Sequence, residues 1–349
     1  MQPLRDEDPR TLGDITLLGR LGKGGMGVVY AGRTPEEDIV AVKTMRAEYS
    51  DQSELRERFN REAVALGMVQ GPGTAALVEV AEPDADPQWM AMEYVSGLDL
   101  AAYVKREGPL DTETGTALSL ILADALAAIH GAGLLHRDLK PSNVMLGPAG
   151  PVFVDFGLAA IGGAGGDLTA TGAVMGTAKF MAPEQFDGAE QVTEAADLYA
   201  LGAVLVYAMT GRYPYDRPTD TAVYLAARNP EIEPDLEGVP QTLVPLLRAL
   251  LAPEPEDRPG LSGVRARLAD RLAAVGLSAG SARRFVAERT HVPGTEVFDS
   301  VRRDEHERPR PTKPKASAPA TAATGTGARR AEVVAERLRK AYARPATAA

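Results

Sequence analysis

The chain has 349 residues and a formal net charge of −10, with 44% hydrophobic and 25% charged residues. This balance is typical of a soluble globular protein and excludes a disordered or collagen-like chain. The absence of cysteine excludes disulfide frameworks, thiolate metal sites and cysteine nucleophiles. We find no apolar run near the roughly 20 residues that cross a bilayer, the best being residues 198–209, and no leader segment at the start. We therefore expect a cytoplasmic protein without a membrane span.

Charge is unevenly distributed along the chain. Residues 276–349 contain 15 Lys and Arg against 8 Asp and Glu, a net of +7, so residues 1–275 carry −17. Phosphate contacts need clustered Lys and Arg, which the acidic body lacks, and we expect no nucleic-acid partner. The basic tail either docks a partner or the acidic body, or is simply solvated.

Residues 15–95 are predicted to form strands and one helix. Strands are expected at 15–21 and 28–31, on either side of a glycine-rich turn, and at 39–45, 77–81 and 88–94. Residues 55–69 have helical spacing of their apolar side chains. From Gly97 on, helical patterns dominate, with helices expected at 112–130, 198–210, 243–251 and 264–275 and a strand at 152–154. A strand-rich part followed by a helix-rich part indicates an α+β fold of two lobes.

The end of the chain lacks core-forming residues. Residues 305–328 contain four prolines and no aromatic or branched aliphatic residue, which predicts a disordered linker. Residues 329–342 are expected to form a short helix. The last core-forming element predicted by the sequence therefore ends near residue 275.

The segment from Gly22 to Gly27 fits the glycine-loop pattern G-x-G-x-x-G. A dinucleotide site needs this loop to open a helix, but a β-type run follows it here. A Walker A loop needs Ser or Thr after its lysine, but Gly24 follows Lys23. What remains is a glycine-tipped hairpin, which either closes over nucleotide phosphates or is an ordinary turn.

Lys43 stands sixteen residues after Gly27 in an apolar strand. An ammonium group there is costly unless it is paired. Glu62 lies on the helix face that carries Phe59 and Leu66, and is a candidate partner. The alternative is an ordinary lysine at a strand edge, without a functional role.

The most specific stretch is His136-Arg137-Asp138-Leu139-Lys140-Pro141-Ser142-Asn143. Asp155-Phe156-Gly157, Ala182-Pro183-Glu184 and a run from Asp197 to Gly202 follow it. Each piece alone has a plainer explanation, because Asp is common in turns. Together and in this order, over residues 15–275, they resemble a bacterial protein kinase of the eukaryotic-like (Hanks) serine/threonine class.

The resemblance implies a bilobal protein kinase fold, with an N-lobe at 15–95 and a larger, mainly helical C-lobe at 96–275. Residues 1–14 would be an N-terminal extension, 276–304 a basic, helical or irregular extension, 305–328 the linker, and 329–349 a short helix and tail. The implied activity is transfer of the γ-phosphate of ATP to Ser and Thr hydroxyls of proteins.

The resemblance also implies residue roles. Asp138 would accept the proton of the substrate hydroxyl, and Lys140 would stabilise the transferring phosphoryl group. Lys43, oriented by Glu62, would hold the α- and β-phosphates. Asn143 and Asp155 would bind Mg²⁺ or Mn²⁺. The other ATP contacts would come from Leu21, Gly22, Lys23, Gly24, Gly25, Met26, Gly27, Val28, Val29, Ala41, Met145 and the backbone of Glu93 and Val95.

Several further positions carry a family role or an open alternative. Val29, Ala41 and Met145 are equally well explained as core residues, and Asp99 either contacts the ribose or starts a helix. Thr177 would bridge Asp138 and Lys140. Structural roles fall to Asp197 and to an ion pair of Glu184 with Arg258. Two positions depart from the family pattern, since residues 71–73 lack its His-Pro pair and Tyr215 replaces its Phe.

Regulation is expected in the loop between Asp155 and Glu184. We expect autophosphorylation at Thr169 and Thr171, with a phosphothreonine pairing with Arg137. The family also forms N-lobe homodimers that phosphorylate in trans. Two other classes remain as alternatives: a pseudokinase that only binds partners, and a small-molecule kinase of similar fold. The first usually lacks Lys43, Asp138 or Asp155, and the second lacks the segment from Gly176 to Glu184.

Overall fold

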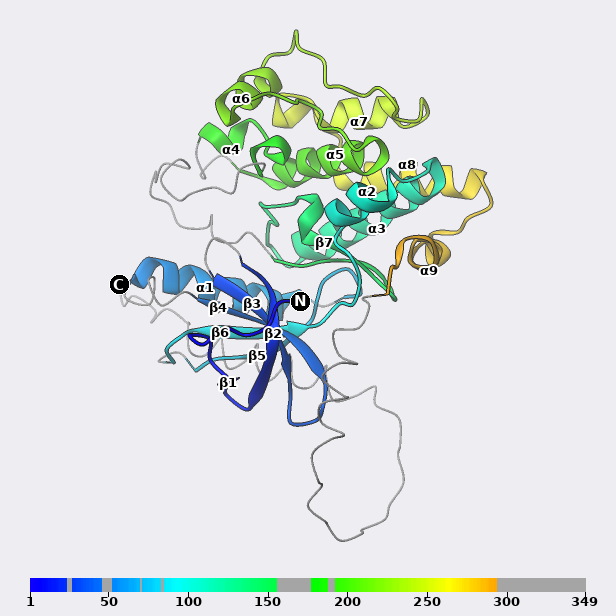
Figure 1. Ribbon diagram of the computed structural model, residues 1–349. Helices are drawn as coiled ribbons and strands as arrows, with labels where there is room; N and C mark the ends of the chain where they lie inside the picture. Colours follow the sequence, from blue (N-terminus) through cyan, green and yellow to red (C-terminus); the bar gives the residue numbers. More distant parts are fainter. Residues whose placement is uncertain are drawn as a thin grey trace, which may run out of the picture. The chain divides into compact units, whose positions relative to one another are not determined.

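The computed structural model describes residues 1–23, 27–45, 52–69, 71–82, 85–155, 177–187 and 192–293 (Figure 1). The chain forms two compact units, which we call the first unit (Met1–Arg56 with Ala76–Tyr94) and the second unit (Glu57–Ala75 with Val95–Pro293). The expected sequence of a strand-rich and then a helix-rich part is confirmed. Predictions for Gly24, Gly25, Met26, Thr169 and Thr171, and for residues 294–349, lie outside the described residues.

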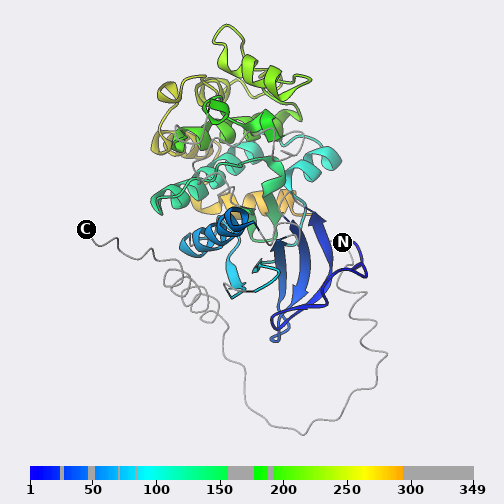
Figure 2. The same ribbon diagram turned by 90° about the vertical axis from the view of Figure 1, so that its left-hand side faces the viewer.

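The first unit is built on an antiparallel sheet with strand order β1-β2-β3-β4-β6-β5 (Figure 2). The strands are β1 Thr11–Leu12, β2 Ile15–Lys23, β3 Gly27–Arg33, β4 Ile39–Met45, β5 Leu77–Val80 and β6 Trp89–Glu93. Successive side chains of a strand point to opposite faces. Val40 and Val42 therefore join Ile15, Tyr30 and Trp89 in the buried core on one face.

Lys43 lies on the other face of this sheet. It is paired with Val29 of β3 and with Met90 of β6. Directly paired residues of antiparallel strands point to the same side, so these three side chains share a face. Ala41, two residues before Lys43, belongs to this face as well. The alternation of β4 thus places Lys43 on the face opposite the core.

The segment before residue 15 is part of the sheet. Gln2 forms a bridge with Arg20, and β1 pairs with β2. The buried carboxylate of Asp8 accepts hydrogen bonds from Arg20 Nε at 2.6 Å and from the Tyr30 hydroxyl at 2.7 Å. The hydrogen bonds from Arg20 hold the pKa of Asp8 well below its usual range. The predicted N-terminal extension is therefore fastened to β2 and β3 by a buried polar cluster.

The second unit is mainly helical. Its helices are α1 Ser53–Met68, which begins in the first unit, and α2 Leu100–Glu107, α3 Thr112–Gly131, α4 Glu184–Asp187, α5 Glu194–Thr210, α6 Asp220–Arg228, α7 Val244–Leu250, α8 Leu261–Ala274 and α9 Ala279–Thr290. The hairpin of β7 Val144–Gly147 and β8 Gly150–Phe153 follows the loop after α3. α3 packs against α5, α8 and α9 and is the centre of the core.

α3 corrects one expectation. Among the described residues it is the helix long and apolar enough to cross a membrane, with a hydropathy of 1.3, whereas the sequence pointed to residues 198–209. In the structure, 72% of that apolar window is buried inside the unit. Asp111 caps the helix, its carboxylate accepting from the N–H of Thr114 at 2.7 Å. The apolar sides of α3 are thus occupied by neighbouring helices.

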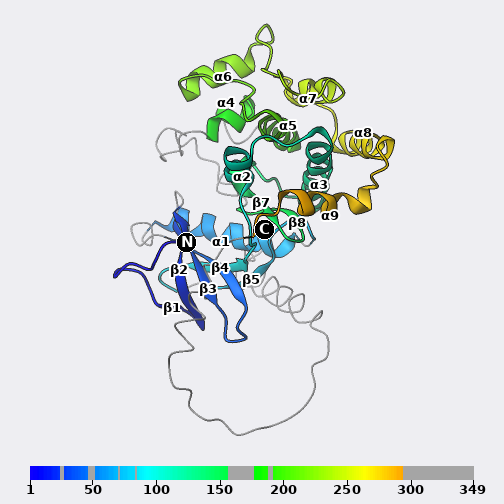
Figure 3. The ribbon, with the colours of Figure 1, turned by 45° about the vertical axis from the view of Figure 1, so that its right-hand side comes forward.

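α9 comes from the predicted extension 276–304. It lies along α3 and against the β7–β8 hairpin (Figure 3). Ala282 and Val286 are completely buried, and Thr290 nearly so. The second unit therefore runs to Pro293, beyond the boundary at residue 275 expected from the sequence.

Candidate active site

The loop of residues 132–143 between α3 and β7 is held by Asp197, in the first turn of α5. The Asp197 carboxylate accepts the backbone N–H groups of His136 and Arg137, each at 2.8 Å. His130 Nε2, at the end of α3, lies 2.8 Å from the same carboxylate. Asp197 is 1% exposed. Charge-assisted bonds of this kind are strong in a buried setting, so the loop has a fixed path just before Asp138.

The backbone on either side of the hairpin is unusual. Arg137 and Asp155 have φ of 63° and 58°, a left-handed conformation that costs residues other than glycine free energy. His136, fully buried, lies edge-on to Phe153 with ring centroids 4.9 Å apart. Burial lowers the pKa of His136, which keeps its ring uncharged and compatible with this apolar packing. The left-handed conformation thus occurs at two positions, Arg137 and Asp155, for which the sequence predicts a role.

Asp138, Lys140 and Asn143 form one cluster. Lys140 Nζ donates to Asp138 Oδ2 at 2.7 Å, and Asn143 Nδ2 donates to the same oxygen at 3.2 Å. Asn143 Nδ2 also donates to the backbone carbonyl of Asp138 at 2.9 Å. The Asp138 side chain is 30% exposed, so its carboxylate is positioned and still reachable from solvent. This is the geometry expected of a general base beside a fixed positive charge.

Asn143 and Asp155 meet the chemical requirements of a magnesium site. Because the amide nitrogen of Asn143 bonds to Asp138, its oxygen Oδ1 is the atom that can face a cation. The N–H of Val154, the residue before Asp155, donates to the Asn143 carbonyl at 2.9 Å and keeps the two residues close. Within the described ranges no three His, Asp or Glu side chains form a metal cluster. One carboxylate and one amide suit Mg²⁺, which takes its other ligands from water and phosphate.

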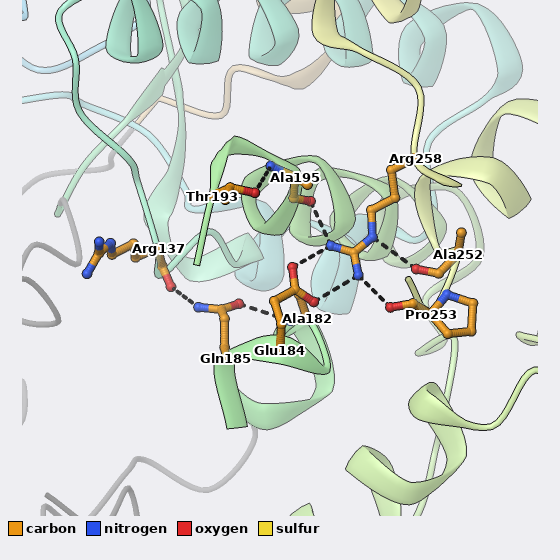
Figure 4. A network of polar contacts seen from close by, with 9 residues as sticks. All are labelled: Arg137, Ala182, Glu184, Gln185, Thr193, Ala195, Ala252, Pro253 and Arg258. Carbon is orange, nitrogen blue, oxygen red and sulfur yellow. Dashed lines mark hydrogen bonds and ion pairs between the residues drawn. The ribbon is translucent and has the colours of Figure 1, made fainter. Parts of the chain in front are cut away.

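Glu184 and Arg258 form the expected buried ion pair (Figure 4). The guanidinium donates to both carboxylate oxygens, at 2.6 and 2.9 Å, and its other N–H groups reach the carbonyls of Ala195, Ala252 and Pro253. All five donors of Arg258 are thus used, and its side chain is 0% exposed. The pair ties α4 to the start of α5 and to the loop before α8.

Gln185 is a link that the sequence did not reveal. Its Nε2 donates to the Arg137 carbonyl at 2.9 Å, and its Oε1 accepts the N–H of Ala182 at 3.0 Å (Figure 4). The loop of Asp138 is therefore joined to the segment at Ala182 by one side chain. Gln185 follows directly on Ala182-Pro183-Glu184, but its residue type gave no signal. His130 was also missed, although its place at the end of the helix before the loop was a usable clue.

The described nucleotide-contact candidates of the first unit line the β2–β3 hairpin and the Lys43 face. Gly22 pairs with Val29, and Lys23 pairs with Val28. A Cβ on Gly27 would lie 1.6 Å from the Thr44 carbonyl oxygen, so a close approach of β4 requires glycine there. The N–H of Glu93 donates to the Ala76 carbonyl at 2.8 Å.

The remaining candidates belong to the second unit. Met145 lies in β7 and is half-buried, and Val95 begins this part of the chain. Asp99 caps α2, with its Oδ1 accepting the Ala102 N–H at 2.8 Å, which agrees with the helix-start alternative. Glu62 is buried on α1, whereas Lys43 belongs to the first unit. The ion pair of these two residues remains a prediction.

Comparison with known proteins places this chain in a family. The protein kinase domain model matches residues 15–267. The chain belongs to the protein kinase family. Its bilobal α+β architecture and the order of its motifs are those expected from the resemblance.

The related proteins are bacterial serine/threonine-protein kinases. AfsK of Streptomyces coelicolor is 40% identical over 289 residues, which are 82% of this chain and 35% of that protein. PkwA of Thermomonospora curvata, a probable kinase of this type, is 41% identical over 77% of this chain and 35% of its own length. PknH of Mycobacterium tuberculosis is 37% identical over 72% of this chain and 40% of its own. The chain thus spans about a third of the length of the first two relatives.

Proposed function

We propose that this chain is an ATP-dependent protein kinase that phosphorylates Ser and Thr hydroxyls. The observation that carries the proposal is the cluster around Asp138. Its Oδ2 accepts hydrogen bonds from Lys140 Nζ at 2.7 Å and from Asn143 Nδ2 at 3.2 Å. A pseudokinase usually lacks the strand lysine, the base or the metal aspartate, and this chain has Lys43, Asp138 and Asp155 at these positions. A small-molecule kinase usually lacks the segment from Gly176 to Glu184, which this chain retains.

The reaction needs alignment and charge compensation more than covalent chemistry. The hydroxyl oxygen of the substrate attacks the terminal phosphorus of ATP, the bond between that phosphorus and ADP breaks, and the hydroxyl proton passes to Asp138. Lys140, beside Asp138, compensates negative charge on the transferred group. Asp197 fixes the loop that carries Asp138 and Lys140, so that neither side chain has to reorganise during transfer.

ATP and Mg²⁺ fit the remaining residues. Asn143 Oδ1 and the Asp155 carboxylate would hold the cation, which when bound neutralises phosphate charge. Lys43 would hold the α- and β-phosphates, with Glu62 orienting it. Ala41 and Val29, on the face of Lys43, would cover the base from one side and Met145 from the other. Manganese can replace magnesium in such an oxygen site.

Regulation and partners belong to this proposal as well. The substrates are proteins with accessible Ser or Thr, and the chain itself is one of them, through Thr169 and Thr171. A phosphothreonine there would pair with Arg137. An N-lobe homodimer would present one copy to another in trans, and the cytoplasm supplies the ATP.

The test uses the full chain and its Asp138→Asn variant with labelled ATP, Mg²⁺ and a generic protein substrate. Wild type is expected to label both the substrate and itself. The variant should bind nucleotide with similar affinity but transfer about 10²–10⁴ times more slowly, because the proton acceptor is lost. A wild-type protein that binds ATP and labels nothing would show that the pseudokinase alternative is correct.

A further inference from the structure

Arg283 on α9 joins two segments that lead to the candidate active site. Its Nη2 group donates to the backbone carbonyl of Pro72, and to that of Pro151 at 2.8 Å. Pro72 belongs to the stretch 71–73 that departs from the usual family pattern. Pro151 lies in β8. One guanidinium therefore spans two backbones that are far apart in sequence.

The two backbones are already paired one step further along. The N–H of Phe153 donates to the Gly73 carbonyl at 2.8 Å, and the N–H of Ala75 donates to the Phe153 carbonyl at 3.0 Å. Residues 73–75 thus run beside β8 as a short parallel bridge. β8 leads within two residues to Asp155, and residues 71–75 come shortly after α1, which ends at Met68 and carries Glu62. This junction therefore connects the segment that leads to Asp155 with the segment that follows the helix of Glu62.

α9 approaches the junction closely. Gly150 has φ +108°, and a Cβ there would lie 3.2 Å from both the Cβ and the carbonyl oxygen of Arg283. The glycine is needed for the backbone conformation and for the contact with α9. On the other side, a cavity of about 220 Å³ lies between α3, α9 and residues 71–74. The hydrogen bonds of Arg283 therefore add a side-chain link from α9 to the two backbone hydrogen bonds that join residues 73–75 to Phe153.

We propose that Arg283 is a positioning residue for phosphoryl transfer, which clamps residues 71–75 to β8 and so fixes Asp155. The proposal rests on the proposed function. It adds a residue outside the matched family domain, which ends at residue 267. The planar guanidinium suits the task, because it presents several donors in fixed directions and holds two carbonyl oxygens at once.

The test compares Arg283→Gln with Arg284→Gln in the full chain. Arg284 is the neighbouring residue of α9, has the same charge, and is 79% exposed, with an ion pair to Glu288 at 3.7 Å. Hydrogen–deuterium exchange measures the protection of residues 71–76 and 150–155. Arg283→Gln should lose protection in both segments, since the shorter amide cannot span the two carbonyls. Arg284→Gln should match wild type, and Arg283→Lys should recover part of the protection.

The second readout is the Mg²⁺ concentration that gives half-maximal phosphoryl transfer at saturating ATP. Residues that support metal ligands change affinity or activity by roughly 10–100-fold when mutated, and we expect about the lower value for Arg283→Gln. A merely structural residue would lower the melting temperature but leave the Mg²⁺ requirement of the folded fraction unchanged.

Protection equal to that of Arg284→Gln would overturn the clamp. Lost protection with an unchanged Mg²⁺ requirement would overturn the positioning role. If wild type itself transfers no phosphate, the proposed function fails, and the exchange data with a direct Mg²⁺·ATP binding titration of the two variants still decide the role of Arg283.

Discussion

Lys140 Nζ lies 2.7 Å from Asp138 Oδ2, and both side chains remain partly exposed, at 22% and 30%. The carboxylate and the ammonium group therefore form one unit that remains open to solvent. Asn143 adds a second hydrogen bond to the same oxygen, so Asp138 stays in place when Lys140 is removed. A Lys140 variant therefore tests the role proposed for Lys140 without displacing Asp138.

Replacing Lys140 with Met is expected to lower kcat with little change in KM for ATP. Loss of one group that stabilises developing charge costs on the order of 10²–10³ in kcat. Steady-state phosphorylation of a protein substrate measures both constants. An unchanged kcat in a folded variant would show that Lys140 does not stabilise the transferred group.

Replacing Lys43 with Met is expected to leave the fold intact and nearly abolish transfer. The lysine lies on the sheet face opposite the core, so a methionine of similar length fits the same space. Nucleotide affinity and the transfer rate check the prediction, and a thermal melt checks that the variant is folded. Lys105→Met, at an exposed position in the last turn of α2, is the control and should behave like wild type.

Breaking the Glu184–Arg258 pair should destabilise the second unit. Arg258→Met leaves a buried carboxylate and three backbone carbonyls without their donors, and removing one partner of a buried pair costs about 3–5 kcal/mol. The exposed pair of Arg248 with Glu233 offers a control, because Arg248→Met should cost about 0–1 kcal/mol. Urea unfolding compares the two. Equal losses would mean that the buried network adds nothing beyond a surface pair.

The stability of the first unit should fall in acid through Asp8. Its pKa is depressed in the folded protein by the hydrogen bonds from Arg20, so its stabilising contribution is fully present above the unfolded value of about 3.9. It is lost as the pH falls below that value toward the lower folded pKa. Asp8→Asn should therefore lower the urea midpoint at pH 7, and the difference should shrink below pH ~4.

The exposed Asp14 provides the matched carboxylate. Asp14→Asn should leave the urea midpoint at pH 7 unchanged. A constant difference between wild type and Asp8→Asn from neutral to acid pH would mean that the ionised form of Asp8 contributes no stability.

The strands of the first unit were predictable because each alternates apolar and polar faces or is apolar throughout. β4 was expected at 39–45 and spans Ile39–Met45. β1 was missed because two residues carry no pattern, and its place depends on the tertiary contacts of Asp8 and Arg20. The helix at 55–69 was likewise close, with α1 at Ser53–Met68.

The supports of the candidate site were predictable in part, because Asp197 and the Glu184–Arg258 pair were expected from the sequence, whereas Gln185 and Arg283 were not. The resemblance depends on the full set of motifs in their order along the chain, and no single motif carries it. Gln185 and Arg283 act on backbone carbonyls, and a carbonyl has no sequence signature. α9 is mostly polar, and its helix depends on the burial of Ala282, Val286 and Thr290, a stripe four residues apart that the basic composition obscured.

The packing of α9 sets a practical limit on how the protein can be shortened. A fragment that stops at residue 267 or 275 would lack the side chains that cover α3 and the β7–β8 hairpin, where Ala282 and Val286 are now fully enclosed. Newly wetted apolar surface of this kind favours self-association. Recombinant versions intended for crystallisation or inhibitor screening should therefore extend at least through Pro293.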